Sequence, residues 1–288
     1  MVGSVPNLST LFRVSFFDFQ KVQFQAVGVL LAAAANILLA WLTGLAGAAT
    51  VTGIILNVLE GMIPAIILLL SGAGVARMIK ADLLKEAPVS TKDAMDFLKK
   101  NLLAIICSPF VLILFIALIL GLEALISVIG FIPIIGPLAL AVLTIPAVIV
   151  NVVLVIIILV GSKLLPAIIA VEETRTIDTI RITYQVCKDE PLKVAFYAGM
   201  LSLIGIGIFL LPFLVFFLGL AFTCTLNWSV LYPLAMSLQC DPVQYLFLMI
   251  AGVSALIMGS LVLALPLTYF QGVYTYLYLS FKDRLVIA

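Results

Sequence analysis

The chain has 288 residues, of which 65% are hydrophobic and only 10% are charged, with a formal net charge of +1. Soluble domains are about half apolar and a quarter charged, so this composition excludes an ordinary soluble domain and predicts a polytopic membrane protein. A polyanion site normally needs a cationic excess on one patch, so the near-neutral net charge favours neither a nucleic-acid nor an acidic-ligand partner.

The N-terminal stretch, residues 8–21, mixes apolar residues at helical spacing with Arg13, Asp18 and Lys21. This pattern indicates either a helix lying in the membrane interface or a simple extension of the first span. The following apolar run carries one charge, Glu60, and a break of small residues at 44–50. Because a span needs about 20 apolar residues, we predict two spans here, near 23–43 and 52–77.

Two charged islands, residues 77–101 and 163–193, divide the rest of the chain into two more apolar runs. The motif FIPIIGP at 131–137 interrupts the first run with two prolines and a glycine, and a stretch of about twenty residues with Trp and Tyr interrupts the second. Each run therefore holds two helices. We predict four further spans, near 102–128, 138–164, 195–221 and 243–272.

The basic residues decide the predicted orientation. If the spans alternate in direction, the N-terminus, the two islands and the C-terminus share one side and carry 2, 6, 5 and 2 of the fifteen Lys and Arg residues. The three opposite loops carry none. The positive-inside rule then predicts that both termini are cytoplasmic, in a multi-pass protein of a bacterial inner membrane.

An amphipathic segment precedes each pair of spans, at 8–21, 90–100 and 173–190. In the third segment one predicted helical face consists of Ile177, Ile180, Tyr184 and Cys187, and another consists of Asp178, Arg181, Gln185 and Lys188. Ser90 with Asp93 resembles a capping box that starts the second segment. Either the chain repeats a unit of interfacial helix plus helical hairpin three times, or these segments share ordinary helix-start chemistry. The predicted fold is all-α, a six-span bundle in one membrane domain over 1–288, with amphipathic interfacial helices on the cytoplasmic side.

Glu60 is a candidate intramembrane polar site, together with Asn36 and Asn151 from other spans. A carboxylate within a span usually faces the bundle interior or a water-filled path, which suits a proton or cation site. The alternative is a carboxyl group at the outer interface that serves packing alone. The absence of histidine excludes imidazole bases, His-ligated haem and most catalytic zinc sites. The sequence also contains no phosphate-binding Gly-Lys-Ser/Thr loop, no paired intramembrane carboxylates and no nucleophile elbow, so we expect no catalytic residue, no metal site and no cofactor.

Cys224 and Cys240 flank the outer stretch between the last two spans. Either they form a disulfide, which would close a loop of about seventeen residues and stabilise the fold by about 3 kcal/mol, or both thiols are free.

Residues from about 72 to 200 resemble a loose group of bacterial integral membrane proteins of the domain-of-unknown-function type. The proteins of this group are similar in style to the membrane domain attached to some glycerophosphodiester phosphodiesterases. The resemblance rests on GAGVARMIKADLLKE, VSTKDAMDFLKKNL, FIPIIGP and LLPAIIAVEETRTIDTIRITYQVCKDEPLK. It implies several spans with amphipathic segments before them, and it supplies no activity.

The short outer loops and the repeated charged segments favour a non-catalytic membrane subunit or scaffold of a larger complex. We expect its partners to be membrane lipids and other membrane protein subunits. The alternative is a small permease or ion-coupled transporter that uses Glu60 with Asn36 and Asn151. A mixed-charge face is the predicted docking surface, and it consists of Lys92, Asp93, Asp96, Lys99 and Lys100.

Overall fold

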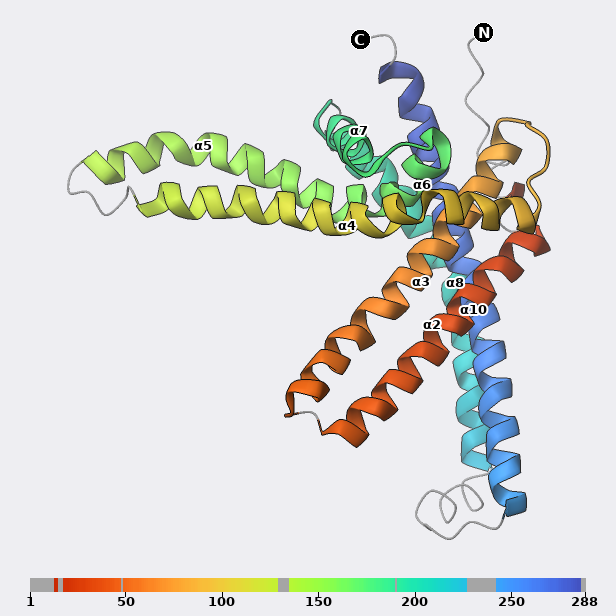
Figure 1. Ribbon diagram of the computed structural model, residues 1–288. Helices are drawn as coiled ribbons and strands as arrows, with labels where there is room; N and C mark the ends of the chain where they lie inside the picture. The colour runs from red at the N-terminus through yellow and green to blue at the C-terminus, as the bar shows by residue number, and fades with distance from the viewer. Residues whose placement is uncertain are drawn as a thin grey trace. The chain divides into compact units, whose positions relative to one another are not determined.

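The computed structural model describes residues 13–14, 18–47, 49–128, 135–189, 191–226 and 242–285 (Figure 1). All regular secondary structure in these residues is helical. The main elements are α2 (Phe19–Ala46), α3 (Val51–Leu83), α4 (Thr91–Val128), α5 (Ile135–Ile156), the π-helix η2 (Ile157–Gly161), α6 (Ser162–Glu172), α7 (Thr176–Asp189), α8 (Pro191–Leu226) and α10 (Pro242–Leu285).

Six helical runs in the described part of the chain are long and apolar enough to cross a membrane. They are Phe19–Ala46, Val51–Leu83, Thr91–Leu125, Val142–Glu172, Pro191–Gly219 and Gly252–Lys282. The predicted all-α, six-span, multi-pass membrane protein is therefore confirmed. The threefold repeat and the interfacial helices stay predictions, and most of the segment 8–21 lies outside the described residues.

The helices fall into two compact units. One unit includes Ala73–Leu201 and Gln271–Ala288, and the other includes Ser15–Gly72 and Ser202–Phe270. The helices α3, α8 and α10 each contribute residues to both units. The single membrane domain over 1–288 stays a prediction.

In the second unit, α2 and α3 are joined by a turn whose residues explain the break in the apolar run. Gly47 ends α2 with φ of +80°, a conformation that favours glycine, and its N–H donates to the Thr43 carbonyl at 3.0 Å. Thr50 then caps α3, because its Oγ1 accepts from the Gly53 N–H at 3.0 Å. Farther along, the two helices touch where Gly28 faces Ser71: a Cβ added at Gly28 would lie 2.3 Å from the Ser71 Cβ.

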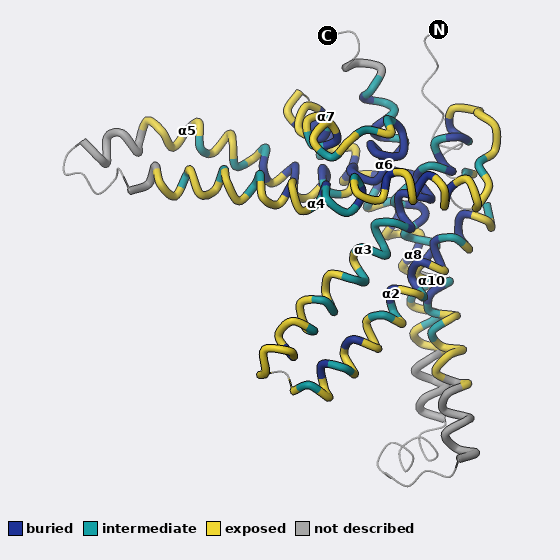
Figure 2. Tube along the Cα trace, in the orientation of Figure 1, coloured by how far each residue is buried: buried dark blue, intermediate teal, exposed yellow. Residues whose placement is uncertain are grey.

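In the first unit, the buried residues gather over α6 and the adjoining parts of α3, α4 and α10 (Figure 2). The α6 residues from Leu164 to Val171 are all buried. Beyond this packed region, α4 and α5 lie side by side as an antiparallel pair and expose mostly aliphatic side chains (Figures 1 and 2). Such a surface suits contact with lipid.

The structure joins two segments that the sequence separates. The predicted amphipathic segment 90–100 and the predicted span 102–128 form one helix, α4, of 38 residues. At 1.5 Å per residue this helix is about 57 Å long, roughly twice the hydrocarbon thickness, so part of α4 must stand outside the membrane. Its predicted capping box is confirmed: Asp93 N–H donates to Ser90 Oγ at 3.2 Å, and Ser90 N–H donates to the Asp93 carboxylate at 3.1 Å.

The π-helix η2 packs against α7. Its wider geometry spans Ile157–Gly161, and Pro166, which has no N–H to donate to the Ser162 carbonyl, follows in α6. At Gly161 the neighbouring α7 comes so close that an added Cβ would lie 2.9 Å from Thr183 Cγ2. Cys187, on the predicted apolar face of α7, is buried against Leu112, Ile157 and Leu165. The interfacial position predicted for this helix stays a prediction.

Candidate functional site

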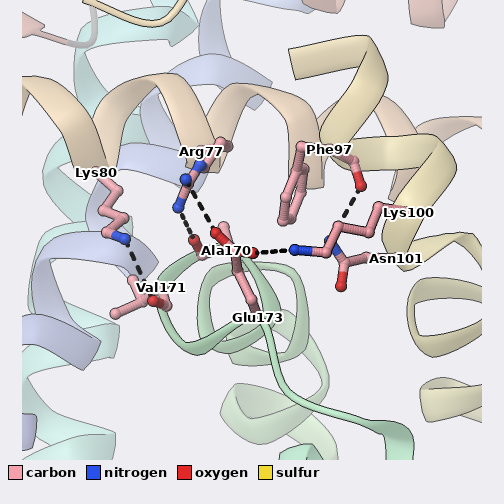
Figure 3. A network of polar contacts seen from close by, with 8 residues as sticks. All are labelled: Arg77, Lys80, Phe97, Lys100, Asn101, Ala170, Val171 and Glu173. Atoms are coloured by element: carbon pink, nitrogen blue, oxygen red, sulfur yellow. Dashed lines mark hydrogen bonds and ion pairs between the residues drawn. The ribbon is translucent and has the colours of Figure 1, made fainter. Parts of the chain in front are cut away.

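A cluster of charged residues surrounds the C-terminal end of α6 (Figure 3). Glu173 follows the last residue of α6 in the left-handed conformation, with φ of +51°, and its N–H donates to the Ile169 carbonyl at 2.9 Å. This backbone conformation costs a residue other than glycine about 1 to 2 kcal/mol. Contacts of the Glu173 side chain offset this cost.

The Glu173 carboxylate binds two cations from the other charged island. Arg77 Nη2 lies 3.0 Å from Oε1, and Lys100 Nζ lies 3.0 Å from Oε2. Hydrogen bonding from the Lys100 ammonium, with the positive charge of Arg77, lowers the pKa of Glu173 although partial burial opposes the shift. Glu173 therefore stays ionised over the physiological range.

The same end of α6 receives further donors. Arg77 Nη1 donates to the Ala170 carbonyl at 3.2 Å, and Lys80 Nζ donates to the Val171 carbonyl at 3.3 Å. The last carbonyls of a helix lack intrahelical partners and carry the negative end of the helix dipole, so cations are favourable there. The Arg77 guanidinium also lies 5.6 Å from the centre of the Phe97 ring.

Glu172 ties the end of α10 to the end of α6. The Tyr278 hydroxyl donates to Glu172 Oε1 at 2.7 Å, and Lys282 Nζ lies 2.8 Å from the same oxygen. Tyr278 is almost fully buried. Both charged islands and the C-terminal basic segment therefore meet at one place in the first unit.

This arrangement is better suited to holding helices together than to chemistry. Glu173 is already paired, and a carboxylate with a lowered pKa is a weak base at neutral pH. Within the described residues, no group of three His, Cys, Asp or Glu side chains could hold a metal ion. The cluster is an electrostatic clamp that fixes the end of α6 to α3, α4 and α10.

The predicted intramembrane polar residues belong to two different contacts. Asn36 Nδ2 donates to the backbone carbonyl of Glu60 at 3.4 Å, in the second unit. Asn151 Nδ2 donates to the Glu123 carboxylate at 3.0 Å, in the first unit. The sequence marks Glu123 as the sole charge of its apolar run, but its partner depends on the register of α4 against α5.

The cysteines give one clear observation. Cys240 lies outside the described residues, so the predicted Cys224–Cys240 disulfide stays a prediction. Cys187 is a free thiol, and burial raises its pKa to about 12. A buried thiol of this kind is unreactive as long as α7 stays packed.

The predicted docking face is exposed on the first turns of α4, while Ala94, Phe97 and Leu98 are buried beneath it. The members of this face are Lys92, Asp93, Asp96, Lys99 and Lys100. Asp96 contacts Lys99 at 3.3 Å, whereas Lys100, which the sequence spaces for a pair with Asp96, binds Glu173.

The sequence does not predict the clamp, although it contains the signal. Two consecutive glutamates follow the apolar run LLPAIIAV directly, and basic residues stand at the end of the second predicted span. The chain matches no protein-family model, no curated protein and no solved structure. The role of the site therefore has to be inferred from its own contacts.

Proposed function

We propose that this protein is a non-catalytic subunit or scaffold of a larger membrane complex in a bacterial inner membrane, with both termini in the cytoplasm. The observation that carries the proposal is the exposed mixed-charge face of α4, which the clamp at Glu173 holds in place through Lys100. Mixed charge of this kind suits a complementary protein surface better than a polyanion.

The use of the other cations supports the proposal. The end of α6 binds three cations through ion pairs and a hydrogen bond, namely Arg77, Lys80 and Lys282. These charges therefore stabilise the fold and already have partners within the protein. Lys92, Asp96 and Lys99 remain at the surface of a helix whose opposite side is buried. A partner protein that binds this face would contact a rigid surface, and this rigidity reduces the conformational entropy lost on binding.

The shared location of the basic segments supports the proposed orientation. Residues from both islands and from the C-terminal segment contact one another, which supports a common side of the membrane for these segments. The test places single cysteines at Lys92 and at Lys282 in a variant without native cysteines. A membrane-impermeant maleimide should label both only after the cells are opened, and labelling in intact cells would overturn the orientation.

The scaffold role can be tested with a charge swap. The double variant Asp96→Lys with Lys99→Asp keeps the i,i+3 pair and the net charge but reverses the sign pattern of the face. Purification in mild detergent should recover stoichiometric partners with the native chain and several-fold less with the swap. The control is Asp178→Lys, an exposed change on α7, which should leave partner recovery unchanged. A lone monodisperse native chain that transports a solute would refute the proposal.

A second candidate function, a small permease or ion-coupled transporter, rests on the contact between Asn36 and the Glu60 backbone. A polar contact between two spans is the kind of feature from which an ion site is built. Solute or ion flux in proteoliposomes should fall with Glu60→Gln if the carboxylate takes part. Unchanged flux would leave the carboxylate without a role.

A further inference from the structure

The α7 helix presents an outward stripe that no other described element covers fully. Its members are Ile177, Arg181, Tyr184 and Lys188, spaced i, i+4, i+7 and i+11. Ile177 is 71% exposed and Tyr184 is 36% exposed. The opposite side of the helix is buried and consists of Thr179, Thr183, Val186 and Cys187.

The buried side is satisfied within the protein. Thr179 and Thr183 donate their hydroxyls to the carbonyls one turn back, at 3.0 and 2.8 Å, so neither polar group needs water. Cys187 belongs to the apolar cluster with Leu112 and Ile157. The α7 helix is therefore a packed part of the fold with one free side.

Two contacts place α7 at the level where a membrane span ends. Thr183 packs against Gly161, two residues before Lys163, which is the first charge after the apolar helix. On the other side, the Tyr184 ring packs edge-on against Phe115 of α4, with centroids 6.1 Å apart. Leu118, one turn along α4 from Phe115 and on the same side of the helix, is 60% exposed within a candidate span. The outward stripe therefore lies next to an exposed apolar surface that suits contact with lipid.

The stripe alternates apolar and basic residues, which is the composition that a bilayer surface requires. Ile177 and Tyr184 can enter the acyl boundary, while Arg181 and Lys188 extend toward phosphates. Lys188 Nζ already lies 5.8 Å from the centre of the Tyr184 ring. The acidic residues Asp178 and Asp189 are rotated about 90 to 110° from the stripe at 100° per residue, so they flank the basic residues without separating them.

We propose that this stripe binds the headgroups of anionic phospholipids in the cytoplasmic leaflet. Each cation near an anionic membrane surface contributes about 1 kcal/mol, so removal of both charges should weaken anionic-lipid binding about 30-fold. This inference rests on the proposed orientation but not on the scaffold role, because the stripe lies on α7 and the docking face lies on α4.

The experiment titrates the purified full-length chain in mild detergent with phosphatidylglycerol or phosphatidylcholine and counts retained lipids by native mass spectrometry. The test variant is Arg181→Gln with Lys188→Gln. The matched control is Lys92→Gln with Lys99→Gln, which removes the same charge from the exposed face of α4. We expect phosphatidylglycerol retention to fall about 30-fold in the α7 variant and to stay near the native value in the control.

Two further measurements make the result decisive. Peptide mapping after maleimide treatment should show Cys187 protected in the α7 variant as in the native chain, which would show that α7 is still packed. Inorganic phosphate at millimolar concentration should not displace the lipid. Native retention in the α7 variant, an equal loss in the control, deprotection of Cys187, or displacement by phosphate would each overturn the proposal.

Discussion

Replacement of Glu173 by glutamine is the most direct test of the clamp. Glutamine keeps the size of the side chain and the unfavourable left-handed backbone but loses the charge that binds Arg77 and Lys100. The Lys100 side chain is 72% exposed, so water screens its ion pair and we expect at most about 1 kcal/mol from it. The Arg77 side chain is only 23% exposed, so its charge-assisted contact with Glu173 should stabilise the fold slightly more than the Lys100 pair does, by about 1 kcal/mol or a little above.

The expected loss is therefore about 2 kcal/mol in the free energy of unfolding, or a fall in Tm of about 4 to 8 °C for a chain of this size. Thermal unfolding in mild detergent can be followed with a thiol-reactive dye in a background that keeps Cys187 as the sole cysteine, because Cys187 becomes reactive only when its surroundings open. The control is Glu86→Gln, which removes a carboxylate from an exposed residue between α3 and α4 and should change Tm by less than about 2 °C.

The difference in Tm between the native chain and Glu173→Gln should depend on pH because the pKa of Glu173 is lowered. A carboxyl group whose pKa is lowered by folding contributes stability above its unfolded pKa, about 4.3, and loses it as the pH falls through the folded pKa. The gap in Tm between the native chain and Glu173→Gln should therefore be constant between pH 7 and pH 5 and should shrink only below about pH 4.5. Equal melting of the Glu173 and Glu86 variants, or a gap that vanishes already near pH 6, would refute the clamp.

Three further predictions concern close contacts between helices. Gly161→Ala should destabilise the packing of α7 by about 1 to 3 kcal/mol, because the new Cβ would lie 2.9 Å from Thr183 Cγ2. The buried thiol of Cys187 should then react with maleimide. Adding Thr183→Ser, which removes the methyl group in the way, should restore protection of that thiol. Gly28→Ala should lower Tm through a collision with α3, whereas Gly61→Ala, where an added Cβ meets nothing within 4 Å, should leave Tm unchanged or raise it slightly. Asn151→Leu removes the donor to an intramembrane carboxylate and should cost about 1 to 3 kcal/mol, measured by the same melting assay.

The sequence predicts the helices well because their causes are local. A run of apolar residues long enough to cross a membrane predicts a span wherever it occurs, and the Ser90–Asp93 cap and the break at Gly47 depend only on neighbouring residues. The boundaries are less accurate where a helix continues beyond its apolar part. The charged turns of α4 are helical as well, so composition alone does not mark where the membrane segment begins.

The site was less predictable because its contacts join distant residues. Lys100 and Glu173 are 73 positions apart, and Tyr278 and Glu172 are 106 positions apart. Charge counts predict that these residues share one side of a membrane, but only the packing of α6 against its neighbours pairs them. The same reason explains why Asn151 contacts Glu123: the register of two helices decides it, and the sequence pattern is silent on that register.

The clamp also bears on how the protein is made. Arg77 and Lys100 leave the ribosome well before Glu173, and at 5 to 20 residues per second the interval between Lys100 and Glu173 is about 4 to 15 seconds. Tyr278 is synthesised later still, so the hydrogen bond from its hydroxyl to Glu172 can form only when nearly the whole chain has been made. The first four spans must therefore enter the membrane with the end of α6 incompletely held, and only a chain synthesised as far as its last helix can close the cluster.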